Sequence, residues 1–375
     1  MREILFKPTL YKFQTFGEFA KEFELKKGDL VFTNKRIYDA YMQKENLPCS
    51  YAFRDTFGKG EPTEESIEAM FAAIPFDSYD RVVAIGGGAI LDTAKLLGLE
   101  RPDTVHNLFF KKYPVQKKKP VIAIPTTCGT GSEVTEISVA IVRDDAGQTT
   151  KLGLVSEELI PTTVCLIPEL LRPLPYKPFV SSAIDALIHA VESYLSPARA
   201  TMTSELFGSR AMELILQGFQ RIAREGPDAR FDFLEEFVTA SLYAGLAFLQ
   251  AGCATVHAMS FPLGGTYGVP HGESNYALFP KVLEKYDAIH PTGKITALKK
   301  TIARSLGGPE DQAIAALCAL LQNILPVRPL REYGVQPADI EKFADSVLLN
   351  QQRLVINSYV PLDRSLIVEI YTECY

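Results

Sequence analysis

Four polar residues in weakly charged surroundings have the chemistry of a metal site. Asp185 and His189 are four residues apart in an apolar stretch that predicts a helix, so they share one face of it. His257 and His271 lie within residues 237–272, which contain no Asp, Glu, Lys or Arg. One carboxylate and three imidazoles suit a divalent ion such as Fe²⁺ or Zn²⁺, with room for a substrate oxygen. Buried histidines are also often hydrogen-bonded core residues, so both interpretations stay open.

A second group of residues has the chemistry of a phosphate site. Gly86, Gly87 and Gly88 follow an apolar strand and open a helix, where backbone N–H groups can approach a phosphate closely. The spacing is not G-x-G-x-x-G, and tight strand–helix turns also use glycine for steric reasons alone. A second turn, rich in hydrogen-bond donors, follows the next predicted strand and includes Thr126, Thr127, Thr130 and Ser132. Two such turns at neighbouring strand ends suit a dinucleotide, and Asp92, Lys95 and Lys151 are further polar candidates.

The elements that must position these residues change along the chain. In the first half, predicted strands at 29–33, 81–85 and 120–124 alternate with helices at 35–44, 64–74 and 88–99, which indicates a parallel sheet with helices on both faces. After the proline-rich segment 172–178 the periodicity is almost entirely helical. Helices are predicted at 179–196, 203–224, 234–249, 295–306, 313–325 and 337–349. We therefore expect an α/β domain at 1–178 and an all-helical domain at 179–375.

Composition limits the class of protein and its location. The 375 residues carry a formal net charge of −6, which gives no electrostatic reason to bind nucleic acid or an anionic membrane. The six cysteines are scattered, with no C-x-x-C pair, and the first residues do not have the pattern of a signal peptide, so we expect a cytoplasmic protein. Polar residues and glycines interrupt the uncharged stretch 237–272, which favours a buried core over a membrane span.

Together these motifs resemble the iron-containing (group III) alcohol dehydrogenases over essentially the whole chain. The resemblance includes the glycine turn with Asp92, residues 125–133, the Asp185 and His189 pair, and His257 followed by His271. It is strongest to members that interconvert 4-hydroxybutyrate and succinate semialdehyde. It implies a Rossmann-like dinucleotide-binding domain followed by an all-α domain, as in the dehydroquinate synthase-like fold.

The resemblance also implies roles for individual residues. Asp185, His189, His257 and His271 would hold the metal, Fe²⁺ or alternatively Zn²⁺. The pyrophosphate of NAD would lie against the glycine turn, with Ala89 where most relatives have Ser. The other implied cofactor contacts are Thr126 and Thr127 to the adenosine half, Ser132 and Thr135 to the phosphates or nicotinamide, and Lys151 to the ribose.

Three positions depart from the pattern of the family, and at one of them Ile167 stands before Pro168 where relatives often have an aspartate. Many relatives have a histidine, proposed as a proton relay, four residues after the third metal ligand, and this chain has Phe261 there. Tyr267 is an alternative proton carrier, but a packing role is favoured for it. Many NAD-specific members have an aspartate after the second strand, where this chain has Asn34, which weakens the expected preference for NAD over NADP.

The implied activity is a hydride transfer from the alkoxide of a small primary alcohol, stabilised by the metal, to NAD. The expected substrate pair is 4-hydroxybutyrate and succinate semialdehyde, and the expected assembly is a homodimer. Three alternatives stay open: a dehydrogenase of butanol or 1,3-propanediol, a lyase of the dehydroquinate-synthase type, and a non-catalytic assembly protein stabilised by a metal. The residue that binds the substrate carboxylate is not identifiable from sequence.

Overall fold

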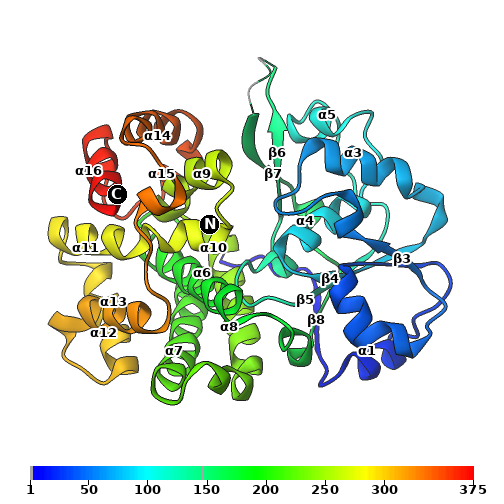
Figure 1. Ribbon diagram of the computed structural model, residues 1–375, viewed down its shortest axis with the longest axis horizontal. Coiled ribbons are helices and arrows are strands. Elements are labelled where there is room, and N and C mark those ends of the chain that lie inside the picture. The colour runs from blue at the N-terminus through cyan, green and yellow to red at the C-terminus, as the bar shows by residue number, and fades with distance from the viewer. Residues whose placement is uncertain (1–2, 146, 148) are drawn as a thin grey trace. The chain divides into compact units, whose positions relative to one another are not determined.

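The computed structural model describes residues 3–145, 147 and 149–375 of the protein (Figure 1). The chain divides into two compact units. One unit comprises Phe6–Leu174, and the other comprises Pro175–Tyr375 together with residues 3–5.

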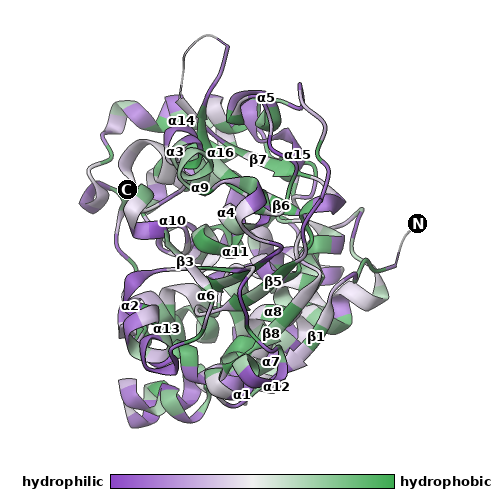
Figure 2. Cartoon of the chain, turned by 90° about the vertical axis from the view of Figure 1, so that its right-hand side faces the viewer, coloured by the Kyte–Doolittle hydropathy of each residue, from purple (hydrophilic) through white to green (hydrophobic). Residues whose placement is uncertain are grey.

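A six-stranded parallel sheet forms the centre of the unit Phe6–Leu174. Its order is β1-β8-β5-β4-β2-β3, and each neighbouring pair is parallel. The strands are β1 (Thr9–Lys12), β2 (Asp29–Thr33), β3 (Ser50–Phe53), β4 (Arg81–Gly86), β5 (Val121–Pro125) and β8 (Thr163–Leu166). In Figure 2 hydrophobic residues run along β5 and β8, as parallel strands buried on both faces require. The predicted fold class of this half is confirmed.

Two separate cores cover the two faces of this sheet. Val82 and Ala84 of β4 pack into one core with residues of α3 (Glu64–Ala73), α4 (Gly88–Leu97) and α5 (Val105–Phe109). Their neighbours Val83 and Ile85 pack into the other core, which includes residues of α1 (Phe16–Glu22). The alternation follows from the two-residue period of a strand.

Parts of this unit differ from the sequence prediction. Residues 35–44 are helical but in three short pieces: α2 (Lys35–Ile37), the π-helical η1 (Tyr38–Met42) and the 3₁₀ turn η2 (Gln43–Glu45). Asn46, at φ 47°, ends this run in a left-handed conformation. An antiparallel hairpin of β6 (Ile137–Arg143) and β7 (Thr149–Val155) was not expected, and it pairs Ile137 with Val155 through Arg143 with Thr149.

Helices make up the regular structure of the unit that begins at Pro175, and its described residues contain no strand. The predicted helices agree closely with α6 (Tyr176–Leu195), α7 (Met202–Glu225), α8 (Leu234–Ala251), α12 (Lys294–Leu306), α13 (Ala313–Ile324) and α14 (Pro337–Asn350). Five helices were not predicted: α9 (Thr255–Tyr267), α10 (His271–Tyr276), α11 (Phe279–Ile289), α15 (Gln352–Val355) and α16 (Arg364–Cys374). At the start of α7, Thr201 and Ser204 form a reciprocal capping box.

The uncharged stretch 237–272 belongs to α8, α9 and the start of α10, and many of its side chains are buried. In the part of the chain that the structure describes, no single helix has both the length and the apolar character needed to cross a bilayer. Helices α8 and α9 meet that test only as a pair, and the pair is bent by 104°.

Candidate functional site

Helix α6 supplies the first two residues of the predicted metal site. Asp185 and His189 lie one turn apart on this helix and are 1% and 4% exposed. Their closest approach joins His189 Nδ1 to Asp185 Oδ2 at 4.0 Å. The His189 ring stacks between the rings of Phe248 and His257, each with its centroid 4.5 Å away, which fixes its orientation.

Two turns bring the other two histidines to α6. Gly252, at φ +80°, lets the chain reverse between α8 and α9, and His257 is the third residue of α9. His271 is the first residue of α10. The next residue, Gly272, lies so close to α6 that an added Cβ would be 2.6 Å from the carbonyl oxygen of Ser181. This close approach requires glycine, and it places His271 beside Asp185.

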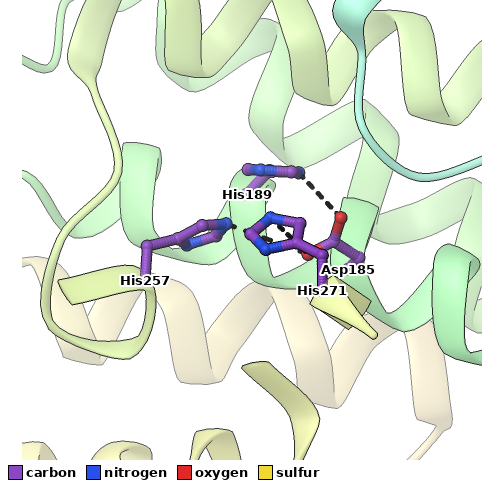
Figure 3. Close-up of side chains that lie close together, drawn as sticks. All are labelled: Asp185, His189, His257 and His271. Atoms are coloured by element: carbon purple, nitrogen blue, oxygen red, sulfur yellow. Dashed lines mark ion pairs between the residues drawn. The ribbon is translucent and has the colours of Figure 1, made fainter. Parts of the chain in front are cut away.

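The four predicted ligands converge on one point (Figure 3). One ligand atom from each lies within 4.8 Å of the others. Asp185 Oδ1 is 3.8 Å from the Nε2 atom of both His257 and His271. Figure 3 shows the four side chains pointing toward one another from three separate helices.

Glu192 fixes the orientation of His257 from behind. Its Oε2 accepts a hydrogen bond from His257 Nδ1 at 2.6 Å, and its carboxylate also accepts from the backbone N–H groups of Ala254 and Val256. With Nδ1 donating to a carboxylate, Nε2 of His257 is the acceptor that faces Asp185. The sequence analysis missed Glu192, although it lies seven residues after Asp185 on the same helical face.

Asn275 shows that the cluster fits a cation. Its Nδ2 atom lies 2.7 Å from Asp185 Oδ1, 3.1 Å from His257 Nε2 and 3.3 Å from His271 Nε2. Its Oδ1 atom is buried and has no hydrogen-bond partner among the described residues. Three acceptor atoms therefore share one NH₂ group, and a divalent ion would satisfy the same three together with His189. Asn275, four residues after His271, was also missed.

The histidines of the cluster lower the pKa values of the neighbouring acidic groups Asp185 and Cys253. Burial opposes the ionised form of Asp185, but His271, His189 and His257 outweigh it and hold its pKa below the usual range. Burial likewise raises the pKa of the Cys253 thiol, yet His257 and His189 act against it and lower the pKa to about 7. Cys253 lies beside Glu192 and His257, and nothing in its sequence context indicated this position.

The predicted phosphate turns lie side by side in the other unit. Strands β4 and β5 are neighbours, with Gly86 opposite Pro125. A Cβ added to Gly87 would be 3.0 Å from Thr127 Cγ2, and one added to Gly88 would be 2.7 Å from Thr130 Cγ2. A Cβ at either position would displace a threonine side chain, so the two turns pack directly against each other.

The start of α4 has the donors that a phosphate requires. The first hydrogen bond of this helix runs from the N–H of Ile90 to the carbonyl of Gly87. The backbone N–H groups of Gly88 and Ala89 therefore precede the hydrogen-bonded turns of the helix. Residues 87–89 are partly exposed, whereas Thr126 is 5% exposed. The arrangement suits the pyrophosphate of a dinucleotide.

Asp92 links α4 to the segment that follows β5. It accepts hydrogen bonds from the hydroxyl of Ser132 and from the backbone N–H of Val139 at 3.0 Å, and it forms a buried ion pair with Lys95 at 3.5 Å. Lys95 Nζ also donates to Thr135 Oγ1 at 3.3 Å. Asp92, Ser132 and Thr135 are thus held in one buried network behind the two turns.

The two remaining cofactor candidates lie at other points of the same unit. Asn34 directly follows β2, and its side chain caps α2 by accepting from the N–H of Ile37 at 2.8 Å. Lys151 lies on β7 and forms an ion pair with Glu61 at 2.9 Å.

Two residues bear on the proton relay: Phe261, at the relay position of the family, and Tyr267, the alternative carrier. Phe261 replaces the relay histidine and is apolar. The Tyr267 hydroxyl donates to Asp339 Oδ2 at 2.5 Å, and its ring packs edge-on against Phe343. This contact matches the packing role that the sequence favoured for Tyr267.

The chain belongs to the iron-containing alcohol dehydrogenase family. The profile described as iron-containing alcohol dehydrogenase matches residues 3–168, and the profile of the C-terminal part of the Fe-containing alcohol dehydrogenase family matches residues 179–375. Membership of this family confirms the predicted oxidoreductase class and with it the expected iron and NAD cofactors.

Individual relatives match over most or all of the chain. The chain is 44% identical over 375 residues to a 4-hydroxybutyrate dehydrogenase of Clostridium kluyveri, with 100% of both chains covered. It is 32% identical over 334 residues to long-chain-alcohol dehydrogenase 1 of Geobacillus thermodenitrificans, covering 84% of this chain and 80% of the relative.

Solved structures share the fold. A 1,3-propanediol oxidoreductase superposes with a TM-score of 0.83 at 24% identity, covering 100% of both chains. A sulfoacetaldehyde reductase from Bifidobacterium kashiwanohense gives a TM-score of 0.83 at 22% identity, covering 100% of this chain and 98% of the other.

Proposed function

We propose that this protein interconverts 4-hydroxybutyrate and succinate semialdehyde with NAD(H) and a divalent metal, Fe²⁺ or Zn²⁺. The choice of substrate rests on the 44% identity to a 4-hydroxybutyrate dehydrogenase, which covers 100% of both chains. The convergence of Asp185, His189, His257 and His271 supports the choice of a metal-dependent oxidoreductase.

In this proposal the four converging side chains hold the ion. When bound, a divalent ion lowers the pKa of an alcohol and polarises an aldehyde carbonyl. His271 has a side chain that is 26% exposed, against 5% or less for the other three residues. The substrate therefore reaches the cluster from the side of His271. Glu192 and Asn275 hold the histidines in place from within the helical unit.

The α/β half binds the dinucleotide in this proposal. The amides at Gly86–Gly88 and Ala89 bind the pyrophosphate. Asp92, Thr126, Thr127, Ser132, Thr135, Lys151 and Asn34 keep the cofactor roles predicted from the resemblance. Residues 1–178 then act as the nucleotide-binding domain, and residues 179–375 act as the domain that binds the metal.

We further propose a cytoplasmic homodimer whose partners are small molecules rather than nucleic acids or membranes. All six cysteines are free thiols, which agrees with a reducing compartment. Met202 and Leu206, one turn apart at the start of α7, are 85% and 68% exposed, which agrees with contact to a second copy. Light scattering after size-exclusion chromatography measures the assembly directly.

Absorbance of NADH with three alcohols tests the activity. With the iron-loaded protein and NAD, 4-hydroxybutyrate should give a higher kcat/KM than butanol or 1,3-propanediol. A preference for butanol or 1,3-propanediol would assign the protein to another dehydrogenase of the family. The absence of NADH formation with any alcohol would favour a lyase of the dehydroquinate-synthase type, or, if metal removal changes only the oligomer, an assembly protein.

Substitution of one ligand tests the metal site separately. His257→Ala should abolish turnover and reduce the bound metal measured by mass spectrometry of the purified protein. The exposed His290→Ala, outside the cluster, is the matched control and should keep both. Full activity of His257→Ala would refute the site.

A further inference from the structure

A dehydrogenase of 4-hydroxybutyrate must recognise a carboxylate as well as an alcohol. The carboxylate is a strong acceptor, and a cation or several donors near the metal cluster must replace its water. The described residues of the helical unit contain several Lys and Arg side chains, so the question is which of them lies beside the cluster with its charge available.

Hydrogen bonds of Asn357 connect the backbone of Arg353 to the segment that precedes His257. The side-chain amide of Asn357 donates to the carbonyl of Arg353 at 3.3 Å and to the carbonyl of Cys253 at 3.0 Å. Next to these residues in the sequence, the hydroxyl of Thr255 donates to that of Ser358 at 2.8 Å. These buried contacts join α15 to the start of α9.

The guanidinium of Arg353 points toward the same side of α9 as the third metal ligand. Its central carbon lies 5.9 Å from the centre of the Phe261 ring. Phe261 is four residues after His257, so both project from one face of α9. The guanidinium therefore lies near Phe261, and Asn357 links the backbone of Arg353 to that of Cys253, four residues before His257.

The charge of Arg353 is available to a ligand. Arg353 is exposed, and none of the ion pairs that the described residues form includes it. Lys177 is another cation close to the cluster in sequence terms, but it forms an ion pair at 2.9 Å with Glu273, two residues after His271. Lys294 is likewise paired, with Glu205 at 2.8 Å.

We propose that Arg353, held over the Phe261 ring of the helix that carries His257, binds the carboxylate of the substrate. This inference rests on the proposed function, because it names the residue that selects a hydroxy acid over a plain alcohol. The planar guanidinium matches a carboxylate with two parallel hydrogen bonds. The Phe261 ring, in place of a polar relay residue, gives the methylene groups of the substrate an apolar neighbour.

The test compares a charged and an uncharged substrate of equal chain length in two variants. Arg353→Met keeps an unbranched side chain against Phe261 and removes the charge. It should raise the KM for 4-hydroxybutyrate by about 10- to 100-fold and leave kcat/KM for butanol within a few-fold of the wild type. Inhibition by butyrate, which has the carboxylate without the hydroxyl group, should weaken by a similar factor. The KM of Arg353→Lys for 4-hydroxybutyrate should lie between those of the wild type and of Arg353→Met.

Arg199→Met is the matched control. Arg199 is also exposed, and its Nη1 atom is 3.3 Å from the position of a Cβ built on Gly252, so it is a second cation near the same turn. It should keep the wild-type preference for 4-hydroxybutyrate. Loss of the preference in Arg199→Met but not in Arg353→Met would overturn the assignment, as would an unchanged KM and unchanged butyrate inhibition in Arg353→Met. Failure of the proposed function itself is distinguishable, because the wild-type enzyme would then show no preference for 4-hydroxybutyrate.

Discussion

Glu192 and His257 form a buried hydrogen bond of 2.6 Å between a carboxylate oxygen and the imidazole nitrogen that faces away from the metal cluster. The pair joins two helices that are far apart in the sequence. It directs the Nε2 atom of His257 at Asp185, and it satisfies the backbone N–H groups that open α9. The histidine is thereby oriented by its surroundings before any ion binds.

Glu192→Gln tests this orientation. The amide keeps the size of the side chain but weakens the acceptor, so metal affinity should fall by about 10- to 100-fold. The affinity is measured by competition with a chelator, and kcat at saturating metal should recover most of its value. Glu205→Gln, which removes an ion pair with Lys294 on the surface of the same unit, is the control and should bind metal like the wild type. Unchanged affinity in Glu192→Gln would show that the hydrogen bond does not position His257.

Gly88→Ala tests the contact between the two phosphate turns. The new Cβ would lie 2.7 Å from Thr130 Cγ2, so Thr130 or one of the turns must move. The substitution should lower the free energy of unfolding by about 1–3 kcal/mol and weaken NADH binding, measured by quenching of protein fluorescence or enhancement of NADH fluorescence. Gly265→Ala in α9 is the control, because its Cβ would meet nothing within 4 Å, and it should be neutral or stabilising by up to about 1 kcal/mol. Equal NADH affinity in both variants would contradict a role of the turn.

Asn34→Asp tests the selection between the two nicotinamide cofactors. Aspartate caps a helix as well as asparagine, so the hydrogen bond to Ile37 and the fold should survive. The added charge should lower kcat/KM for NADP by about tenfold or more and change the value for NAD little, because it repels a 2′-phosphate. Asn46→Asp adds the same charge at the end of the following helical run. It should not alter the ratio of kcat/KM for NAD to kcat/KM for NADP. A ratio that moves equally in both variants would mean that only net charge matters.

Glu133 makes stability depend on pH in a defined direction. Burial raises its pKa from 4.5 to about 7, against the opposing effects of its own backbone and of Lys95. The folded protein therefore holds this proton more tightly than the unfolded chain. Its contribution to stability is complete below pH 4.5 and is lost as pH rises through about 7.

Glu133→Gln should remove that dependence. Relative to the wild type, the free energy of unfolding of the variant should rise by about 3 kcal/mol between pH 4.5 and 8. Denaturant titrations at a series of pH values measure the difference, and the exposed Glu310→Gln should instead run parallel to the wild type. A constant difference between wild type and Glu133→Gln would contradict a raised pKa.

The sequence predicted the parts of the fold that are strongly patterned. Strands β2, β4 and β5 are continuous apolar runs and lie inside the sheet, where both faces are buried. The edge strand β1 was missed because its four residues are exposed and therefore lack such a run. Helix α9 was missed because Pro262 and two glycines interrupt its pattern.

The candidate site also has one part that the sequence predicted and another part that depends on tertiary contacts. Asp185 and His189 are neighbours through helical spacing alone, which is visible in the sequence. That His257 and His271 reach the same point depends on the reversal at Gly252 and on the close approach at Gly272, which are tertiary contacts. Glu192, Asn275 and Cys253 could not be ranked above other polar residues of buried helices, because their importance arises from which atoms they face.

Residues 3–5 belong to the helical unit although the remainder of that unit begins 170 positions later, at Pro175. The hydroxyl of Thr201 donates to the carbonyl oxygen of Glu3, and Thr203 bonds to the Glu3 side chain. A gene divided between Leu174 and Pro175 would thus yield a helical half without the partner of these two threonines. Recombinant expression of that half, for structural study or for building hybrid enzymes, would need the short segment supplied again, for example by grafting it through a linker onto the new amino terminus.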